Sequence, residues 1–197
     1  VKRLEYANHF WETRKRKGVT LYEAEKWMRE RNYFGLMMVN TGEADAMVTG
    51  HSRSYPTTIK PVMQLIDKAP GVSKIATTNM MMTARGPIFL SDTAINPNPS
   101  ADDLARIALM TAKTVRMFGM EPVIAMVSYS NFGSSHNEGP SKISQAVAYL
   151  HENFPDLIVD GEIQTDFALN SDMLKSKFPF SKLVNKKVNT LIFPNLD

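Results

Sequence analysis

Three polar segments of the chain carry side chains that could bind an anionic ligand. Each follows an apolar run, and the segments are residues 50–58 (GHSRSYPTT), 128–135 (SYSNFGSS) and 160–166 (DGEIQTD). Loops of this composition expose backbone N–H groups, and a loop that leads into a helix N-terminus is suited to bind phosphate. The third segment adds carboxylates and an amide, which suit polar recognition or acid–base chemistry.

Each loop alone reads most simply as a capped turn, whereas the three together indicate one anion-binding cleft. Its candidate residues are Ser54, Thr57, Ser128, Asn131, Ser134, Ser135 and Asp166.

The elements that must position these loops alternate between helix and strand. Thr20 with Glu23, and Ser100 with Asp103, form capping boxes that predict helix starts. Apolar spacing of three to four residues predicts helices over residues 21–31, 56–66, 101–118 and 141–154. Apolar runs predict strands over residues 46–49, 74–83, 88–90, 123–127, 157–159 and 188–193, with Met80, Met81 and Met82 in the core.

Strands separated by helices of this length predict the α/β class, with right-handed crossovers and a mostly parallel sheet covered on both faces. Ligands of such sheets bind beyond the carboxyl ends of the strands. All three polar segments follow predicted strands directly, so we expect them at that edge.

Composition excludes several kinds of chemistry. The chain has no cysteine, which excludes disulfides, thiolate zinc sites and cysteine nucleophiles. It has neither a G-x-G-x-x-G nor a P-loop motif, and the spacing of its four histidines is not that of metal ligands, so no metal site is expected. No apolar run approaches the roughly 20 residues of a membrane span, and no export signal is visible. We therefore expect a cytoplasmic protein that does not bind membranes.

The charge is unevenly distributed. The formal net charge of +3 is too small to indicate nucleic-acid binding by itself. Residues 14–17 (RKRK) form a dense basic cluster, and Lys175, Lys177, Lys182, Lys186 and Lys187 form a sparser one. Either cluster could meet an anionic ligand, but a charge run taken by itself more often forms a solvated surface.

Five segments resemble phosphate acetyltransferases, and together they span nearly the whole chain. They are ADAMVTG (44–50), INPNPSADDLARIA (95–108), SYSNFGSS (128–135), DGEIQTDFAL (160–169) and NTLIFPNLD (189–197). The third has Asn-Phe-Gly-Ser-Ser where free-standing transferases typically have Ser-Thr-x-Gly-Ser. In this respect the chain most resembles the transferase-like C-terminal region of large bacterial NADP-dependent malic enzymes.

The resemblance implies a two-lobed α/β/α architecture akin to that of isocitrate and isopropylmalate dehydrogenases. The lobes would cover about residues 1–95 and 96–197, with a cleft for coenzyme A and acetyl phosphate, in a homo-oligomer. Basic residues that the family associates with these ligands fall on Arg14 and Lys60. Lys60 replaces the usual arginine, which keeps the charge but loses the bidentate fork.

The family's catalytic Ser-Arg pair has no counterpart in the right motif here, because Ser52-Arg53 stands in GHSRSYP. We therefore expect a fragment that lacks both ends of the family domain and has no catalytic residue of its own. Malic-enzyme chemistry would require NADP and a divalent metal, which we expect only in an upstream part of the parent.

Three hypotheses follow. In the first, this is a regulatory and assembly module of a malic enzyme that binds acetyl-CoA or a related acyl-CoA. In the second, it belongs to an active phosphate acetyltransferase, which moves acetyl between phosphate and the CoA thiol. In the third, the protein is not an enzyme, and the RKRK cluster is a nucleic-acid-binding or localisation signal on an ordinary α/β scaffold; the resemblance does not support this, and we expect no nucleic-acid partner.

Overall fold

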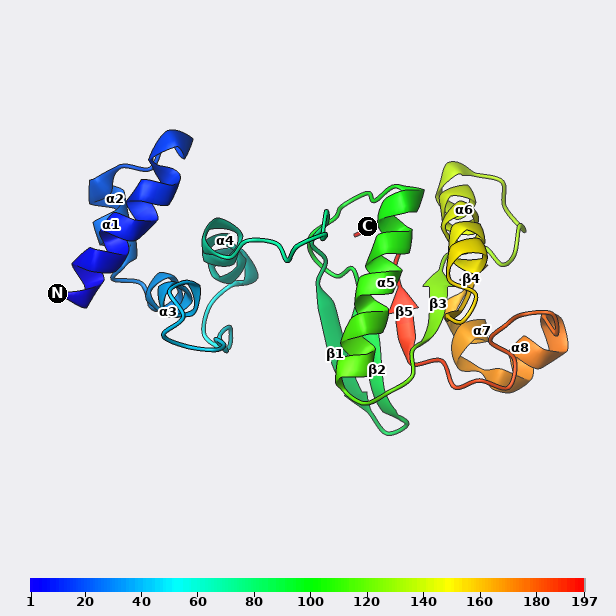
Figure 1. The fold of residues 1–197 in the computed structure, drawn as a ribbon. Coiled ribbons are helices and arrows are strands. Elements are labelled where there is room, and N and C mark those ends of the chain that lie inside the picture. The colour runs from blue at the N-terminus through cyan, green and yellow to red at the C-terminus, as the bar shows by residue number, and fades with distance from the viewer. Residues whose placement is uncertain (197) are drawn as a thin grey trace. The chain divides into compact units, whose positions relative to one another are not determined.

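The computed structural model describes residues 1–196, and the chain divides into two compact units, Val1–Gly71 and Val72–Asp197 (Figure 1). The first unit is helical. Its elements are α1 (Lys2–Arg14), the 3₁₀ turn η1 (Lys15–Lys17), α2 (Leu21–Trp27), α3 (Arg31–Asn40) and α4 (Tyr55–Leu65). The lobe boundary expected near residue 95 stays a prediction.

Aromatic side chains form the centre of the first unit. Phe10 is fully buried and meets Trp27 and Tyr33 edge-on, with ring centroids 5.9 and 5.7 Å away. The Tyr33 hydroxyl donates a 2.6 Å hydrogen bond to Gln64, which joins α3 to α4. The capping box predicted at Thr20 and Glu23 is present at the start of α2.

The strand predicted over residues 46–49 is wrong, because this segment has no regular secondary structure. Val48 is fully exposed, whereas Met47 packs on the helical core. A buried strand would bury a continuous run of side chains. Here only one apolar side chain of the run contributes to a core cluster, so sequence alone overstated this element.

The second unit contains a five-stranded sheet in the order β1-β2-β5-β3-β4. Strands β1 and β2 pair antiparallel, and every other neighbouring pair is parallel. The elements in chain order are β1 (Thr78–Thr83), β2 (Gly86–Ser91), α5 (Ala101–Met117), β3 (Val123–Val127), α6 (Glu138–Asn153), β4 (Ile158–Ile163), α7 (Thr165–Leu169), α8 (Ser171–Lys177) and β5 (Thr190–Ile192). The predicted α/β class with a mostly parallel sheet is confirmed.

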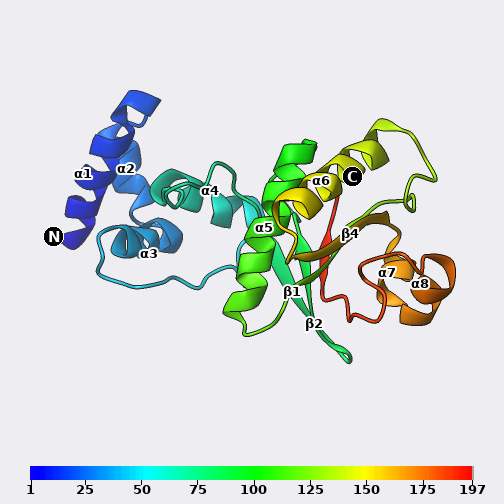
Figure 2. The ribbon, with the colours of Figure 1, turned by 45° about the vertical axis from the view of Figure 1, so that its right-hand side comes forward.

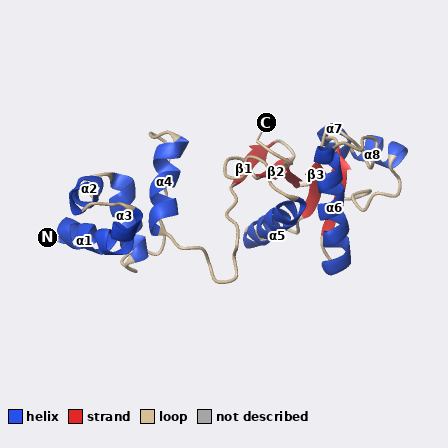
Figure 3. Ribbon diagram, turned by 90° about the horizontal axis from the view of Figure 1, so that it is seen from above, coloured by secondary structure: helices blue, strands red, loops and turns tan. Residues whose placement is uncertain are grey.

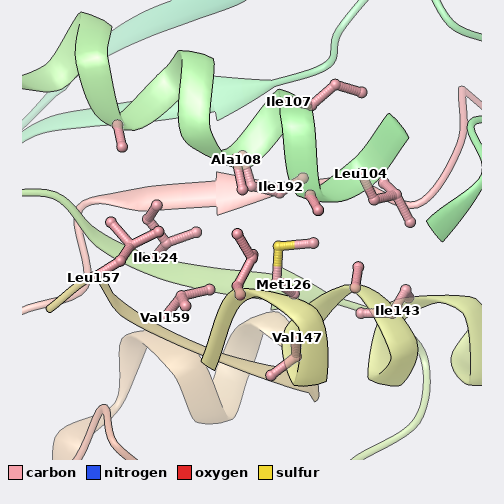
Figure 4. Close-up of a cluster of buried hydrophobic side chains, with 14 residues drawn as sticks. Leu104, Ile107, Ala108, Ile124, Met126, Ile143, Val147, Leu157, Val159 and Ile192 are labelled. Carbon is pink, nitrogen blue, oxygen red and sulfur yellow. The ribbon is translucent and has the colours of Figure 1, made fainter. Parts of the chain in front are cut away.

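Helices cover both faces of this sheet (Figures 2 and 3). On one face, side chains of α5 and α6 meet Ile124 and Met126 of β3 and Ile192 of β5 (Figure 4). On the other face, α7, α8 and the segment before β5 pack against Ala125 and Leu191. Strand β3 is buried along its whole length, as its continuous apolar sequence predicts.

The prediction that Met80, Met81 and Met82 lie in the core is wrong. Their side chains are 44%, 52% and 71% exposed. The reason is topological, because β1 is an edge strand that pairs only with β2. The apolar sequence correctly predicts a strand but cannot say that the strand lies at the edge.

Candidate functional site

A β-bulge at the carboxyl end of β4 directs Glu162 toward the polar loops. Met126 of β3 pairs with Gly161, and the next residue, Val127, pairs with Ile163, so Glu162 is the extra residue. Gly161 has φ +149°, and a Cβ built on it would lie 2.5 Å from the carbonyl oxygen of Met126. Only glycine fits there, and bulges of this kind often reorient a side chain near a functional site.

Glu162 is the centre of the loop's hydrogen-bond network. Its side chain is buried, and Oε1 accepts from the backbone N–H of Gly133 at 2.5 Å and from the Ser130 hydroxyl at 3.2 Å. Its second oxygen, Oε2, accepts from the hydroxyl of Ser144 on α6. One carboxylate therefore joins β4, α6 and the loop of residues 128–135.

The four residues predicted from this loop hydrogen-bond within the loop or with Gln164, and Ser130 and Gly133 link the loop to the Glu162 carboxylate. Ser134 lies 2.9 Å from the Ser130 hydroxyl, which also accepts the N–H of Ser135 at 3.1 Å. Ser128 accepts the N–H of Ser130 at 3.2 Å. Asn131 pairs twice with Gln164, donating at 2.6 Å and accepting its backbone N–H at 2.8 Å.

Phe132 has an unusual backbone conformation, and the structure shows how it is held. Its φ is +45°, in the left-handed region that non-glycine residues rarely adopt. Its ring lies 5.0 Å from those of both Phe178 and Phe180, and its N–H donates to the Glu162 carbonyl at 2.8 Å. Aromatic packing thus supports a backbone conformation that would otherwise cost about 1–3 kcal/mol.

A cavity of about 320 Å³, which we call the Ser128 cavity, opens beside this loop. It is lined by Asn98, Ser128, Tyr129, Glu138, Gly139, Lys142, Ile143, Pro194 and Asn195. Residues 128 and 194 follow the carboxyl ends of β3 and β5, the edge at which ligands of parallel sheets bind. Asp166 does not line this cavity; it is exposed on α7.

The lining of the Ser128 cavity suits an anionic group. Lys142 is half-buried and donates to Asn98 at 2.6 Å. Tyr129 also belongs to this lining; hydrogen bonds of its hydroxyl with Ser135 and then Asn137 lower its pKa below the ordinary value, which favours the phenolate and does not itself attract an anion. The 16-residue helix α6 begins at this cavity, so its first N–H groups add positive potential.

The predicted residues of the first unit divide between two places. Arg14 donates to the backbone carbonyls of Met63 at 3.3 Å and Gln64 at 2.8 Å, so it binds the carboxyl end of α4. Ser54, whose hydroxyl lies 2.8 Å from that of Thr57, is the residue before α4. Any contact of Arg14 with a ligand stays a prediction.

Thr57 and Lys60 line a cavity of about 490 Å³, which we call the Trp27 cavity. The other lining residues are Trp27, Glu30, Asn32, Tyr33, Arg53, Pro56 and Pro61. The Lys60 ammonium lies 5.3 Å from the Trp27 ring, a cation–π contact. Arg53 forms an ion pair with Glu30 at 2.9 Å, whereas Lys60 makes no ion pair with a carboxylate of residues 1–196 and acts on Glu23 only through its charge.

Sequence reasoning missed Lys142, Tyr129 and the central position of Glu162. Glu162 stood among the carboxylates of the third polar segment, so part of the signal was visible. Lys142 lies on a helix far from any recognised motif, and no spacing marks it. In residues 1–196 no group of three or more His, Asp or Glu side chains is arranged to hold a metal ion, and no helix is long and apolar enough to cross a membrane.

The amino-acid sequence of the chain is similar to those of known proteins. Residues 2–197 match the sequence model described as phosphate acetyl/butaryl transferase. The chain is 39% identical over 192 residues to a phosphate acetyltransferase of Synechocystis sp., and 37% identical over 194 residues to an NADP-dependent malic enzyme of Escherichia coli. These matches cover 98% of the chain but only 27% and 25% of the two relatives.

A solved phosphotransacetylase from Streptococcus pyogenes has the same fold. It aligns with a TM-score of 0.83 and 37% identity, over 98% of this chain and 58% of that one. The chain therefore spans about a quarter of the two sequence relatives and more than half of this solved structure.

Proposed function

Since the chain belongs to the phosphate acetyl/butaryl transferase family, we propose that it is the transferase-like region of an NADP-dependent malic enzyme. In this proposal the region binds acetyl-CoA or a related acyl-CoA, regulates malate decarboxylation carried out elsewhere in the parent, and assembles a homo-oligomer. The parent's NADP and divalent metal bind outside residues 1–197, and the protein works in the cytoplasm.

The observation that carries this proposal is the polar lining of the Ser128 cavity. Lys142, the Ser128 and Tyr129 side chains and the first N–H groups of α6 supply one cation and several donors at one place, and Glu138 adds one carboxylate to the same lining. Coenzyme A presents phosphates, which such groups recognise. At about 320 Å³ the cavity accommodates one end of this ligand rather than all of it.

The network around Glu162 favours binding over catalysis. Both carboxylate oxygens of Glu162 already accept hydrogen bonds from residues of the loop and of α6. A general base needs to reach the proton that it removes. Glu162 is buried, and both of its oxygens already accept hydrogen bonds. We therefore assign it the role of holding the loop in place and not that of deprotonating a thiol.

The test is an activity assay on the full-length parent enzyme, because the proposal puts the NADP and metal sites outside residues 1–197. We expect acetyl-CoA to change the rate of malate-dependent NADPH formation several-fold, which corresponds to a coupling free energy of about 1–3 kcal/mol. Lys142→Gln should raise the acetyl-CoA concentration needed for this effect, whereas Lys113→Gln, on the exposed side of α5, should not. A malate-dependent rate that is insensitive to acetyl-CoA contradicts the regulatory role.

The alternative is an active phosphate acetyltransferase, which the Synechocystis relative and the Streptococcus pyogenes structure favour by name. In that reaction the CoA sulfur forms a bond to the acetyl carbon of acetyl phosphate, inorganic phosphate leaves, and the thiol proton is released. Formation of acetyl-CoA from acetyl phosphate and CoA by the full-length parent enzyme, without malate-dependent NADPH formation, would support this alternative over our proposal.

A further inference from the structure

A third cavity, of about 530 Å³, lies at the amino ends of the parallel strands, whereas the Ser128 cavity lies at their carboxyl ends. We call it the Lys187 cavity; it is lined by Arg85, Pro87, Ile88, Ala168, Leu169, Ser171, Asn185, Lys186, Lys187 and Val188. Residues 87 and 88 begin β2, and residue 188 precedes β5, so this is the amino end of two parallel strands. Residue 194, in the Ser128 cavity, follows the other end of β5.

Three cations and no carboxylate line the Lys187 cavity. In the part of the chain that the structure describes, Arg85, Lys186 and Lys187 form no ion pair. Six other Lys and Arg side chains do pair with a carboxylate. Like charges gathered without a counterion repel one another, and an anion bound between them removes that repulsion.

Hydrogen bonds to backbone carbonyls hold two of these cations, Lys187 and Arg85, at the cavity. Lys187 donates from Nζ to the backbone carbonyl of Arg85 at 2.5 Å, which joins the β1–β2 turn to the segment before β5. The Arg85 guanidinium reaches the Leu169 carbonyl at 3.4 Å, at the end of α7. Asn185 has φ +59°, so the chain turns in the left-handed region just before Lys186.

Apart from the three cations, the lining contains two uncharged polar residues, Ser171 and Asn185, and is otherwise apolar. Pro87, Ile88, Ala168, Leu169 and Val188 form the apolar part. A cavity of several hundred cubic ångströms with an apolar wall and a few charged groups is typical of a site for a small organic molecule. We propose that the Lys187 cavity binds a small organic anion with a phosphate or carboxylate head and an apolar body.

The proposal does not depend on the function of the Ser128 cavity, since the two cavities share no lining residue. The basic residues 186 and 187 belong to the sparser cluster noted in the sequence, so the structure gives part of that cluster a place. The other three lysines of the cluster do not line the cavity.

Calorimetric titration of the purified protein with phenyl phosphate tests the site. We expect saturable binding that is at least five-fold tighter than that of inorganic phosphate or of phenol, because each lacks half of the proposed ligand. Titration with benzoate tells whether a carboxylate head serves as well as a phosphate. Affinity should fall as sodium chloride rises, since salt screens exposed charges.

Variants locate the binding. Arg85→Gln and Lys186→Gln should each weaken phenyl phosphate binding at least five-fold, whereas Lys113→Gln and Lys142→Gln, elsewhere on the unit, should change it less than two-fold. Because Arg85 and Lys186 are exposed, both variants should keep the far-UV circular dichroism spectrum and the melting temperature of the unsubstituted protein. If Arg85→Gln loses stability, Lys186→Gln decides the question alone.

Two results would overturn the proposal. One is the absence of saturable binding by both phenyl phosphate and benzoate. The other is binding that Lys142→Gln abolishes and that Arg85→Gln and Lys186→Gln leave intact, which would assign the anion to the Ser128 cavity.

Discussion

Glu162 shows how one buried carboxylate can organise a binding loop. Its partners are two hydroxyls and a backbone N–H. Hydrogen bonds to a charged acceptor are stronger than neutral ones, and leaving their donors unsatisfied in a buried place is costly. The position of this side chain depends on the bulge at Gly161, so backbone geometry and loop structure are coupled.

Truncation of this side chain should therefore destabilise the second unit. Glu162→Ala should lower the free energy of unfolding by about 3 kcal/mol, because three donors lose their acceptor. Glu162→Gln keeps an acceptor oxygen and should lose about 1 kcal/mol. Urea titration followed by far-UV circular dichroism measures both, with Glu152→Gln on the exposed side of α6 as control. Equal stability of Glu162→Ala and this control would contradict the role given to Glu162.

Asp92 makes the fold sensitive to acid. Burial alone would raise its pKa, but hydrogen bonds from Thr77, Ala94 and Asn96 outweigh burial and lower the pKa from 3.8 to about 2. A carboxyl whose pKa is depressed by folding contributes stability above its unfolded pKa, and this contribution disappears as pH falls through the folded value.

We therefore expect Asp92 to contribute about 2 kcal/mol at neutral pH and to lose that contribution between about pH 4 and pH 2. Urea unfolding of the unsubstituted protein and of Asp92→Asn, measured across this pH range, gives the difference in their free energies of unfolding. The two stabilities should converge toward pH 2. A difference that stays constant from pH 6 to pH 2 would show that the Asp92 carboxylate is not stabilised by folding.

At the scale of elements, local sequence signals predicted what depends on neighbours in the chain. The capping box at Ser100 and Asp103 and the apolar spacing after it predicted α5, and the structure has this cap and helix. The apolar run at residues 123–127 predicted β3 with the same bounds. These signals act over a few residues, so a sequence suffices to detect them.

Features that depend on distant partners could not be predicted in this way. The exposure of Met80–Met82 follows from the edge position of β1, which only the strand order reveals. The bulge that directs Glu162 needs the register between β3 and β4. Likewise Arg14 is engaged by carbonyls some fifty residues away. The loop of residues 128–135 was predictable as a polar segment, but its hydrogen-bond partners were not.

The edge position of β1 leads to a prediction about substitution. Met82→Lys should change the free energy of unfolding by less than about 0.5 kcal/mol, because Met82 is 71% exposed. Met126→Ala should cost about 2–5 kcal/mol, because Met126 is fully buried in β3 between α5 and α6 (Figure 4). Urea titration compares them; similar losses in both variants would mean that β1 is covered in solution.

At the scale of the whole molecule, the two units have separate cores. The buried residues of one cluster all belong to the sequence range 6–65, and those of the other two clusters belong to the second unit. Residues 66–77, which join them, contain no helix or strand. Segments that lack regular structure and lie exposed are preferred sites of proteolysis.

Limited trypsin digestion should therefore cut first after Lys68, which is exposed within this segment. Lys74 is half-buried and paired with Asp103 at 3.1 Å, so it should be cut more slowly. Mass spectrometry of early fragments identifies the site. First cuts within α1 or α5 would contradict the division into two units.

The central claim is that the Ser128 cavity binds part of an acyl-CoA, and calorimetric titration of the purified protein with acetyl-CoA tests it most directly. We expect saturable one-site binding that Lys142→Gln weakens at least five-fold and that Lys113→Gln leaves unchanged. Absence of acetyl-CoA binding, or equal affinity of the unsubstituted protein and of Lys142→Gln for acetyl-CoA, would contradict this claim.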